Sequence, residues 1–191
     1  MNIVIEDQLL RDCSRGDSKA QYKLYRACYS FLMGICIRYA PSREDAEELL
    51  NSGFLKVLNQ IDKRRPEVPF VLWIRRIMIN TIIDEFRKKK LERETIEYVD
   101  FGESPDEYDA VSVNEFIARM DVEQLQVLID RLPQMSRKVF NLFVVDGYGH
   151  KEIAEMLGMS EGTSKWHVNF SRNKLKEWLA ASIPNLQHAA S

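Results

Sequence analysis

The sequence predicts an all-α protein: two small helical domains joined by a flexible acidic linker, with a helix-turn-helix in the C-terminal domain. Apolar residues recur at intervals of three and four, and almost no segment alternates with a period of two. The stretch from Asp146 to Leu179 has the pattern of two helices around a tight turn. A region rich in Glu and Asp separates it from the N-terminal helices. We expect domains at residues 1–91 and 113–183 and the linker at 92–112.

Length and charge restrict the class of protein. The chain has 191 residues, enough for one large domain or two small ones, and a formal net charge of -2. Between Asp62 and Lys90 there are nine Lys or Arg against four acids, whereas residues 91–120 hold nine acids against two Arg. A basic region of this kind suits a nucleic-acid partner even though the whole chain is slightly acidic.

Cysteine usage and hydropathy indicate a location inside the cell. Cys13, Cys28 and Cys36 have no CxxC spacing, which suits reduced thiols in a cytoplasmic protein. No signal peptide and no apolar run of membrane length occurs, so we expect a soluble protein without direct membrane insertion.

Residues 6–40 are expected to form one or two helices, with Gly16-Asp17-Ser18 as a break and cap. The tyrosines and cysteines between Tyr22 and Cys36 have helical spacing, and we interpret them as core residues. Pro41 ends this part, and Ser42 begins a sequence that resembles a capping box.

Residues 44–61 have the most regular amphipathic pattern in the chain. The apolar face includes Phe54, and the other face carries Glu48, Asn51 and Leu55. Leu55 is either an ordinary exposed leucine or the apolar centre of a surface that binds a partner.

A basic loop at 62–69 precedes a helix at 70–90 that should be buried on more than one side. One narrow stripe of this helix stays mostly polar and comprises Arg76, Asn80, Ile83 and Arg87. The helix ends in four cations, Arg87 to Lys90. Cations suit a helix C-terminus, but four exceed what capping needs, so a phosphate-binding role is open beside it.

The C-terminal domain should begin near Val113 and contain a helix from Ser136 to Val145, with Val139, Phe140, Phe143 and Val144 inside. The tail after Pro184 has no pattern.

The helix-turn-helix follows from local signals. The first helix runs from about His150 to Leu157, and Gly158 stands where a helix end favours positive φ. Ser160 is expected to cap the second helix by accepting a hydrogen bond from the amide of Thr163. In such a motif the second helix lies in the major groove of DNA.

The second helix places large aromatics opposite an apolar face. Its inward residues include Val168, Leu175 and Leu179, and the opposite stripe holds Thr163, Trp166, His167, Phe170 and Lys174. Either Trp166 and Phe170 are core residues of a helix buried on two sides, or they meet bases and sugars. In the second case Lys165 and Arg172 would hold phosphates.

Three motifs in order resemble one family. They are DAEELLNSGFLKVL (45–58), PFVLWIRRIMINTIIDEFRKKK (69–90) and LPQMSRKVFNLFVVDGYGHKEIAEMLGMSEGTSKWHV (132–168). Together with the acidic linker they resemble the extracytoplasmic-function (ECF) sigma factors, the promoter-recognition subunits of bacterial RNA polymerase. The resemblance covers about residues 6–180.

The resemblance implies that the chain binds core RNA polymerase, directs it to promoter DNA and assists strand opening. Residues on or supporting the polymerase-docking face would be Asp45, Glu48, Asn51, Phe54, Leu55 and Lys56. Residues that hold the opened strand would be Arg64, Arg65, Arg76, Asn80, Arg87 and Lys88. Residues that address the minus-thirty-five element as duplex would be Ser160, Thr163, Lys165, Trp166, His167, Phe170 and Arg172.

Four sites, seven residues in all, depart from the family's usual pattern. Trp166-His167 follows Lys165 where a Ser-Arg pair is common, and Ser164 replaces an aliphatic residue. Ser52-Gly53 replaces an acid and an aliphatic residue, and Gly149-His150 replaces a Ser-aromatic pair. These differences bear on the promoter sequence that is read, not on the architecture.

The alternative is a polymerase-independent helix-turn-helix regulator whose N-terminal domain dimerises or senses a signal. That hypothesis leaves Arg64, Arg65 and the basic end of the 70–90 helix without a role. An enzyme is not expected, because no His, Cys or acid cluster has metal-ligand spacing and no glycine loop suits a phosphate. We therefore expect no metal, cofactor or small-molecule substrate. The family implies an anti-sigma factor as a further partner in many members.

Overall fold

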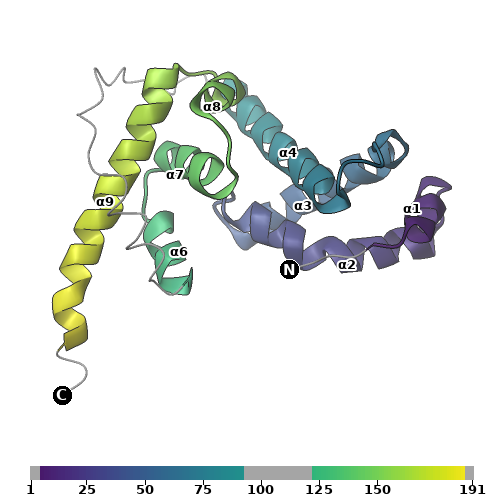
Figure 1. The fold of residues 1–191 in the computed structure, drawn as a ribbon, viewed down its shortest axis with the longest axis horizontal. Helices are drawn as coiled ribbons and strands as arrows, with labels where there is room; N and C mark the ends of the chain where they lie inside the picture. The colour runs from purple at the N-terminus through teal and green to yellow at the C-terminus, as the bar shows by residue number, and fades with distance from the viewer. Residues whose placement is uncertain (1–4, 93–121, 188–191) are drawn as a thin grey trace. The chain divides into compact units, whose positions relative to one another are not determined.

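The computed structural model describes the backbone of residues 5–92 and 122–187, and the side chains of residues 5–89 and 125–180. Within these ranges the chain forms helices and the turns between them, as Figure 1 shows, which confirms the predicted all-α class. The chain divides into two compact units, Met1–Ile96 and Glu97–Ser191. Apart from Glu92, the predicted linker at 92–112 and the predicted start at Val113 lie outside the described residues, so these boundaries stay predictions.

The first unit contains α1 (Asp7–Ser14), α2 (Ser18–Ile37), α3 (Arg43–Gln60), a short 3₁₀ turn (Ile61–Lys63) and α4 (Phe70–Glu92). The predicted break between the first two helices is confirmed. Gly16 has a φ of 82°, and the Asp17 carboxylate accepts a hydrogen bond from the Ala20 amide at 2.9 Å. Ser42 caps α3 in the same way, since its hydroxyl accepts from the Asp45 amide at 3.0 Å.

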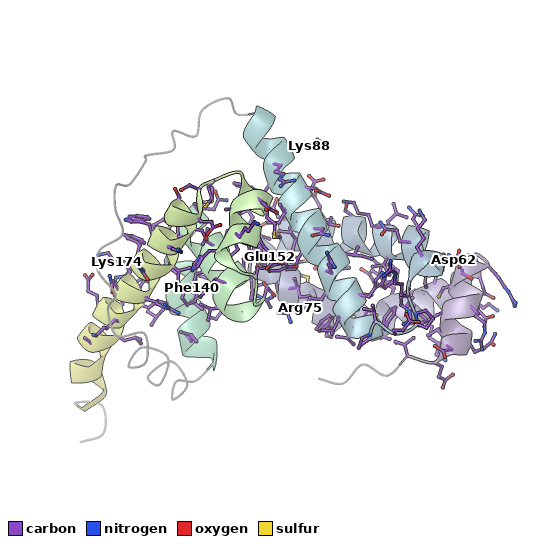
Figure 2. The ribbon with its side chains drawn as sticks, turned by 45° about the horizontal axis from the view of Figure 1, so that its top comes forward. Asp62, Arg75, Lys88, Phe140, Glu152 and Lys174 are labelled. Atoms are coloured by element: carbon purple, nitrogen blue, oxygen red, sulfur yellow. The ribbon has the colours of Figure 1, made fainter. Side chains whose placement is uncertain are left out.

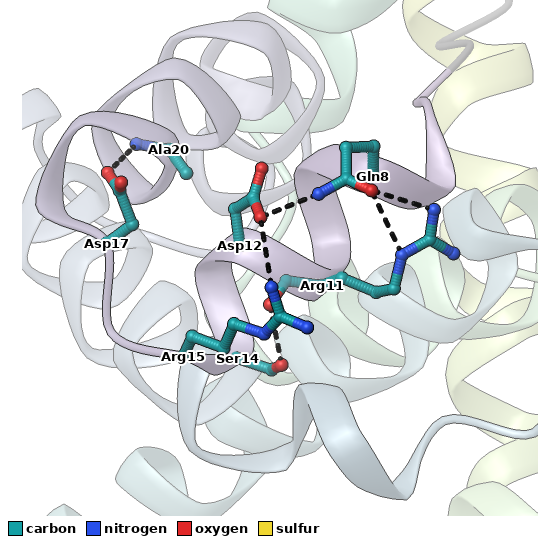
Figure 3. A network of polar contacts seen from close by, with 7 residues as sticks. All are labelled: Gln8, Arg11, Asp12, Ser14, Arg15, Asp17 and Ala20. Carbon is teal, nitrogen blue, oxygen red and sulfur yellow. Dashed lines mark hydrogen bonds and ion pairs between the residues drawn. The ribbon is translucent and has the colours of Figure 1, made fainter.

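The surface of α1 carries a small polar network, drawn in Figure 3. The Gln8 amide donates to Asp12 at 2.8 Å, and Arg11 donates to the Gln8 side-chain oxygen at 3.0 Å. These contacts are exposed and contribute little to stability. The burial of Leu10 and Cys13 is what holds α1 to the unit.

The core of this unit lies where α2, α3 and α4 pack on one another. The most deeply buried side chains include Leu24, Leu32, Leu50, Val57, Ile74, Met78 and Ile79. Gly53 permits a close approach of α3 and α4, because a Cβ there would lie 2.5 Å from Met78 Cε and 2.6 Å from Met78 Sδ. The glycine that departs from the family pattern is therefore required by this packing.

Three orientations in the first unit differ from the prediction. Tyr22 was expected in the core but is exposed, while Tyr25 and Tyr29 are half-buried. Leu72 lies in the helix that was expected to be buried on more than one side, but it is exposed. Ile83 was expected on the polar stripe and is buried, because α2 and α3 both pack on α4.

The second unit contains α6 (Val122–Asp130), α7 (Gln134–Phe140), a π-helical turn (Asn141–Val145), α8 (His150–Leu157) and α9 (Glu161–Gln187). The predicted turn between the last two helices is confirmed: Gly158 has a φ of 64°, and the Ser160 hydroxyl accepts from the Thr163 amide at 3.0 Å. An apolar cluster fills this unit's core and comprises Leu128, Ile129, Leu132, Phe140, Leu175 and Leu179.

Two helix predictions in this unit are corrected. The helix predicted from Ser136 to Val145 changes to π geometry at Asn141, and the wider turn rotates the following residues. Val144 is therefore exposed, and Phe143 is only half-buried. At the other end, α9 continues past Pro184 to Gln187, where a patternless tail was expected.

None of the helices in the described ranges is long and apolar enough to span a bilayer.

Candidate nucleic-acid and protein interfaces

One face of α3 presents Glu48, Asn51 and Leu55 to solvent. Leu55 is 59% exposed although it lies in the middle of a well-packed helix. The Tyr25 hydroxyl donates a hydrogen bond to Asn51 Oδ1 at 3.0 Å, so α2 orients the central side chain of this face. A leucine among oriented polar groups suits a protein–protein contact.

Phe54 lies beneath this face rather than on it. Its side chain is buried, and its ring packs edge-on against Tyr25 at 5.1 Å between centroids. Phe54 was expected either on the docking face or beneath it. The structure favours the position beneath, where Phe54 supports the face through Tyr25. Phe54 offers a partner little surface in this conformation, because it is only 6% exposed.

Asp45 and Lys56 point towards α4. Lys56 Nζ lies 3.0 Å from Asp84 Oδ2, and Lys89 Nζ lies 3.8 Å from Asp45 Oδ1. Of these two predicted polymerase-binding residues, Lys56 thus pairs with an acid of α4 and Asp45 with a base of α4. Because all four side chains are partly exposed, each pair contributes little stability and can exchange partners at low cost.

The loop before α4 contains two arginines with different surroundings. The Arg64 side chain is only 15% exposed, donates to the Val68 carbonyl oxygen at 2.9 Å, and lies 3.8 Å from Asp7 Oδ1 of α1. Arg65 is exposed, and its side chain has no hydrogen-bond or ion-pair partner among the described residues, although its carbonyl oxygen accepts from the Val68 amide at 3.1 Å. Arg64 therefore fixes the loop, and Arg65 is the side chain available to a ligand.

The outward face of α4 is cationic and polar. Arg76, Asn80 and Arg87 are exposed on one stripe, and the fourth member is Asp84 in place of the expected Ile83. Lys88 is exposed one residue further, near the end of the helix in Figure 2. The predicted strand-binding residues of α4 thus share one accessible surface.

The N-terminal half of α9 carries the predicted duplex-binding residues. Lys165 is exposed, and Thr163, Trp166, Phe170 and Arg172 are half-buried. Trp166 and Phe170 stack with 5.0 Å between ring centroids and 17° between planes. They are neither sealed in the core nor fully exposed, so part of the stacked pair meets solvent. Ser160 is exposed, but its hydroxyl caps the helix.

His167 was predicted to face outward, and this prediction is wrong. It is 8% exposed, and its Nδ1 lies 2.9 Å from Ser136 Oγ. Burial lowers the pKa of His167 to about 4, so the ring is neutral near pH 7. A neutral, enclosed imidazole cannot address a DNA duplex from this position.

The structure also reveals a pair that the sequence analysis did not assign to the site. His150 Nδ1 lies 3.0 Å from Ser164 Oγ, and the imidazole stacks on Phe143 at 4.3 Å with 16° between planes. The Arg172 guanidinium lies 5.8 Å from the centroid of the same Phe143 ring. Two departures from the family pattern, at residues 150 and 164, are therefore matched to each other. The only feature of the sequence that could have indicated this pair is that both departures lie in the helix-turn-helix.

No group of three or more His, Cys, Asp or Glu side chains in the described ranges could hold a metal ion. Cys13, Cys28 and Cys36 are buried free thiols, and burial raises the pKa of Cys28 and of Cys36 to about 12. These cysteines are inert core residues at neutral pH.

Comparisons with known proteins show which family the chain belongs to. Residues 24–92 match the model of Sigma-70 region 2, and residues 122–175 match that of Sigma-70 region 4. The RNA polymerase sigma factor SigZ of Bacillus subtilis (strain 168) is 31% identical over 133 residues, covering 70% of this chain and 72% of that protein. The ECF RNA polymerase sigma factor SigE of Mycolicibacterium smegmatis is 25% identical over 166 residues, covering 83% of this chain and 58% of that protein.

Among solved structures, the sigma factor RpoE in complex with the anti-sigma factor NepR from Bartonella quintana has a TM-score of 0.49 and 21% identity, covering 83% of this chain and 96% of that chain. The two sigma-region matches occur in order along the chain, and the similarity to SigZ extends over more than two thirds of both proteins. The chain therefore belongs to the extracytoplasmic-function family of RNA polymerase sigma factors, which are transcription initiation factors.

Proposed function

We propose that this sigma factor uses three separate surfaces. The outward face of α3 docks on core RNA polymerase, the outward face of α4 holds the opened promoter strand, and the N-terminal half of α9 binds the minus-thirty-five duplex. The observation that carries the proposal is that two cation-bearing helix faces occur on two different compact units. These two faces suit a promoter during opening, because its DNA is then single-stranded in one part and duplex in another.

The polymerase-docking surface is proposed to comprise Glu48, Asn51 and Leu55. Leu55 supplies the apolar contact, and the two polar residues supply orientation. Phe54 and Tyr25 act beneath the surface by holding Asn51 in place. Asp45 and Lys56 contribute through their pairs with α4.

The strand-binding surface is proposed to comprise Arg65, Arg76, Asn80, Arg87 and Lys88. Cationic side chains hold the phosphates, and the Asn80 amide can donate to or accept from a base edge. Opening costs a few kcal/mol for each base that leaves the stack, so released bases need such partners when no ATP is used. Arg64 is assigned to positioning the loop, not to contacting the strand.

The duplex-binding surface is proposed to comprise Thr163, Lys165, Trp166, Phe170 and Arg172. The edge of the Trp166–Phe170 stack suits a thymine methyl group or a deoxyribose, whereas Lys165 and Arg172 suit phosphates. Ser160 contributes as the cap that fixes the start of α9. His167 is not part of this surface.

The proposal includes no catalytic step of the chain's own and places the protein in the cytoplasm, where core polymerase acts. An anti-sigma factor, which the family resemblance implies for many members, is proposed as a further partner.

The test is promoter-specific transcription. Purified chain is added to core RNA polymerase, complex formation is followed by size-exclusion chromatography, and run-off transcripts are scored on genomic promoter fragments. We expect a stable complex and discrete start sites. Failure to form a complex would overturn the proposal. Tight duplex binding without polymerase, measured by gel shift, would instead favour the polymerase-independent regulator.

A further inference from the structure

The imidazole of His150 is fixed on two sides. Its Nδ1 is held by the buried Ser164 hydroxyl at 3.0 Å, and its ring face lies on Phe143 at 4.3 Å. Its other ring nitrogen, Nε2, has no hydrogen-bond partner among the described residues. The side chain therefore presents one unoccupied nitrogen in a fixed direction at the start of α8.

Two cations lie near this ring without an acidic partner. The Arg172 guanidinium contacts the same Phe143 ring, and its Nε is shielded from water with no hydrogen-bond partner. Lys165 is exposed and, like Arg172, forms no ion pair within the described ranges. A buried guanidinium nitrogen without a partner costs free energy unless an acceptor reaches the group.

The charges around His150 favour its neutral form in the free protein. Burial, followed by the positive charges of Lys165 and Arg172, lowers the pKa of His150, while Glu161 acts in the opposite direction. On α8 itself, Glu152 accepts a hydrogen bond from the Gly149 amide at 2.8 Å, and Lys151 is exposed. The neighbouring π-helical turn, Asn141–Val145, contains no titratable side chain, and Asp146 after it has a partner of its own.

We propose that His150 is a further DNA contact of this sigma factor, and that it takes up a proton when a backbone phosphate of the duplex binds beside Lys165 and Arg172. This inference rests on the proposed duplex-binding role of α9. In the step, neutral imidazole binds one proton from solvent, and the imidazolium N–H donates to a phosphate oxygen. The phosphate's negative charge offsets the repulsion that the two cations exert on the imidazolium.

Proton uptake makes duplex affinity depend on pH in a defined direction. The pKa of His150 lies below its ordinary value in the free protein and rises when phosphate is bound. Affinity is therefore highest at low pH and falls as pH rises through the interval between the free and bound pKa values. The slope within that interval approaches about tenfold per pH unit for one proton. Above the bound pKa, the charge-assisted part of the His150 contact is lost, and a neutral imidazole retains at most an ordinary hydrogen bond.

The experiment measures binding of the full-length protein to a short fluorescent duplex by anisotropy, at low salt and over a pH series. His150→Phe keeps an aromatic ring on Phe143 but removes both nitrogens. His188→Gln is the control, because the chain has three histidines and His167 stays neutral well below pH 6. We expect wild type and His188→Gln to bind up to tenfold tighter than His150→Phe at low pH, with the difference shrinking as pH rises.

The salt dependence of binding supplies a second readout. If His150 had a purely structural role, the difference in salt slope between wild type and variant would not change with pH. At low pH the slope of log affinity against log salt should be shallower by about one in His150→Phe, because one phosphate contact is lost. At high pH the two slopes should agree. A difference of equal size at both pH values would mean that the variant has perturbed the fold, and would overturn the proton-linked contact.

NMR provides a test on the unmodified protein. The Hε1 resonance of His150 is titrated alone, with duplex, and with inorganic phosphate at the same concentration of phosphate groups. We expect its pKa to rise with duplex and to change little with inorganic phosphate. An unchanged pKa in the duplex complex would overturn the inference and leave the proposed function intact. An equal rise with inorganic phosphate would overturn the assignment to the DNA backbone. Absence of duplex binding both by the free protein and by its polymerase complex would instead overturn the proposed function.

Discussion

Ser136 Oγ lies 2.9 Å from His167 Nδ1, and this contact joins the first turn of α7 to the second turn of α9. The Ser171 hydroxyl donates to the His167 carbonyl oxygen at 2.8 Å and lies 3.4 Å from the Ser136 carbonyl oxygen. All three residues are buried. The rotation of the recognition helix about its axis is therefore set by directional polar contacts as well as by apolar packing.

Acidification should destabilise this unit through His167. Burial lowers its pKa from 6.5 to about 4 in the folded state, so between these values the unfolded chain binds a proton that the folded chain does not. Stability is thus fully present above about pH 6.5 and is lost as pH falls towards 4, by about 3 kcal/mol at most. Urea unfolding at several pH values, followed by circular dichroism, measures this loss.

His167→Gln is the control for that prediction, because glutamine does not titrate. The variant should be less stable at neutral pH, where the Ser136 contact is altered, but should lose less stability on acidification. Parallel curves of unfolding free energy against pH for the two proteins would assign the acid sensitivity to other groups.

The close approach at Gly53 predicts opposite effects for two Gly-to-Ala changes. A Cβ at Gly53 would lie within 2.6 Å of the buried Met78 thioether, so Gly53→Ala should destabilise by about 1–3 kcal/mol. Gly34 lies in α2 with nothing within 4 Å of the added Cβ, so Gly34→Ala should stabilise by about 0.5–1 kcal/mol. Thermal or urea unfolding compares them.

Shortening Met78 tests whether this contact is the cause. In the Gly53→Ala, Met78→Ala double variant the losses should be less than additive, since the new methyl group occupies space that the methionine vacates. Strict additivity would show that the contact with Met78 is not the cause of the loss at Gly53.

The two loop arginines should behave differently. Arg65→Ala should reduce open-complex formation by roughly tenfold, about 1.4 kcal/mol, without changing stability. Arg64→Ala should also reduce opening but, in addition, should make the loop more sensitive to limited proteolysis, because the Val68 contact is lost. Fluorescence of 2-aminopurine in the promoter reports opening.

Asp7→Ala separates the two contacts of Arg64. Asp7 is 3.8 Å away and its side chain is 77% exposed, so its loss should matter less than that of the Val68 hydrogen bond. If Arg64→Ala reduced promoter opening but left the loop as resistant to proteolysis as in wild type, Arg64 would be assigned to strand binding instead of loop positioning.

Charge reversal on α3 should affect polymerase binding alone. Glu48→Lys, at an exposed position, should weaken the complex with core polymerase by tenfold or more, roughly the cost of placing one charge against a surface selected for its opposite. Glu6→Lys makes the same change at the exposed N-cap position of α1, where the side chain makes no capping hydrogen bond, and should bind normally. Pull-down affinity is the readout, with circular dichroism as the fold check.

The stacked aromatics and Arg172 should contribute different parts of duplex binding. Arg172→Ala should cost about 1–3 kcal/mol. Trp166→Ala should weaken binding and relax sequence preference, whereas Trp166→Phe should retain most of both because the stack on Phe170 persists. Holoenzyme binding to minus-thirty-five variants measures preference. If Trp166→Ala left both quantities unchanged, Trp166 would have only a packing role.

Much of this fold is determined by local sequence. Helix periodicity, the caps at Asp17, Ser42 and Ser160, and the left-handed Gly158 act within a few residues of themselves. These features determine where the helices and the helix-turn-helix lie. The three family motifs lie in the same helices. The chain's own residues therefore predicted the all-α class and the helix-turn-helix, whereas the candidate surfaces came mainly from the family resemblance.

The tertiary structure decided which way the polar residues at the edge of each helix face point. His167 turns inward because Ser136 lies across from it, 31 residues away, and Arg64 is occupied because α1 brings Asp7 to it. Along a helix, adjacent residues differ by 100° of rotation, so periodicity alone cannot assign a boundary residue such as Ile83 to either face. Only the packed partner supplies that information, because the free energy of burying a polar or boundary side chain depends on what it meets.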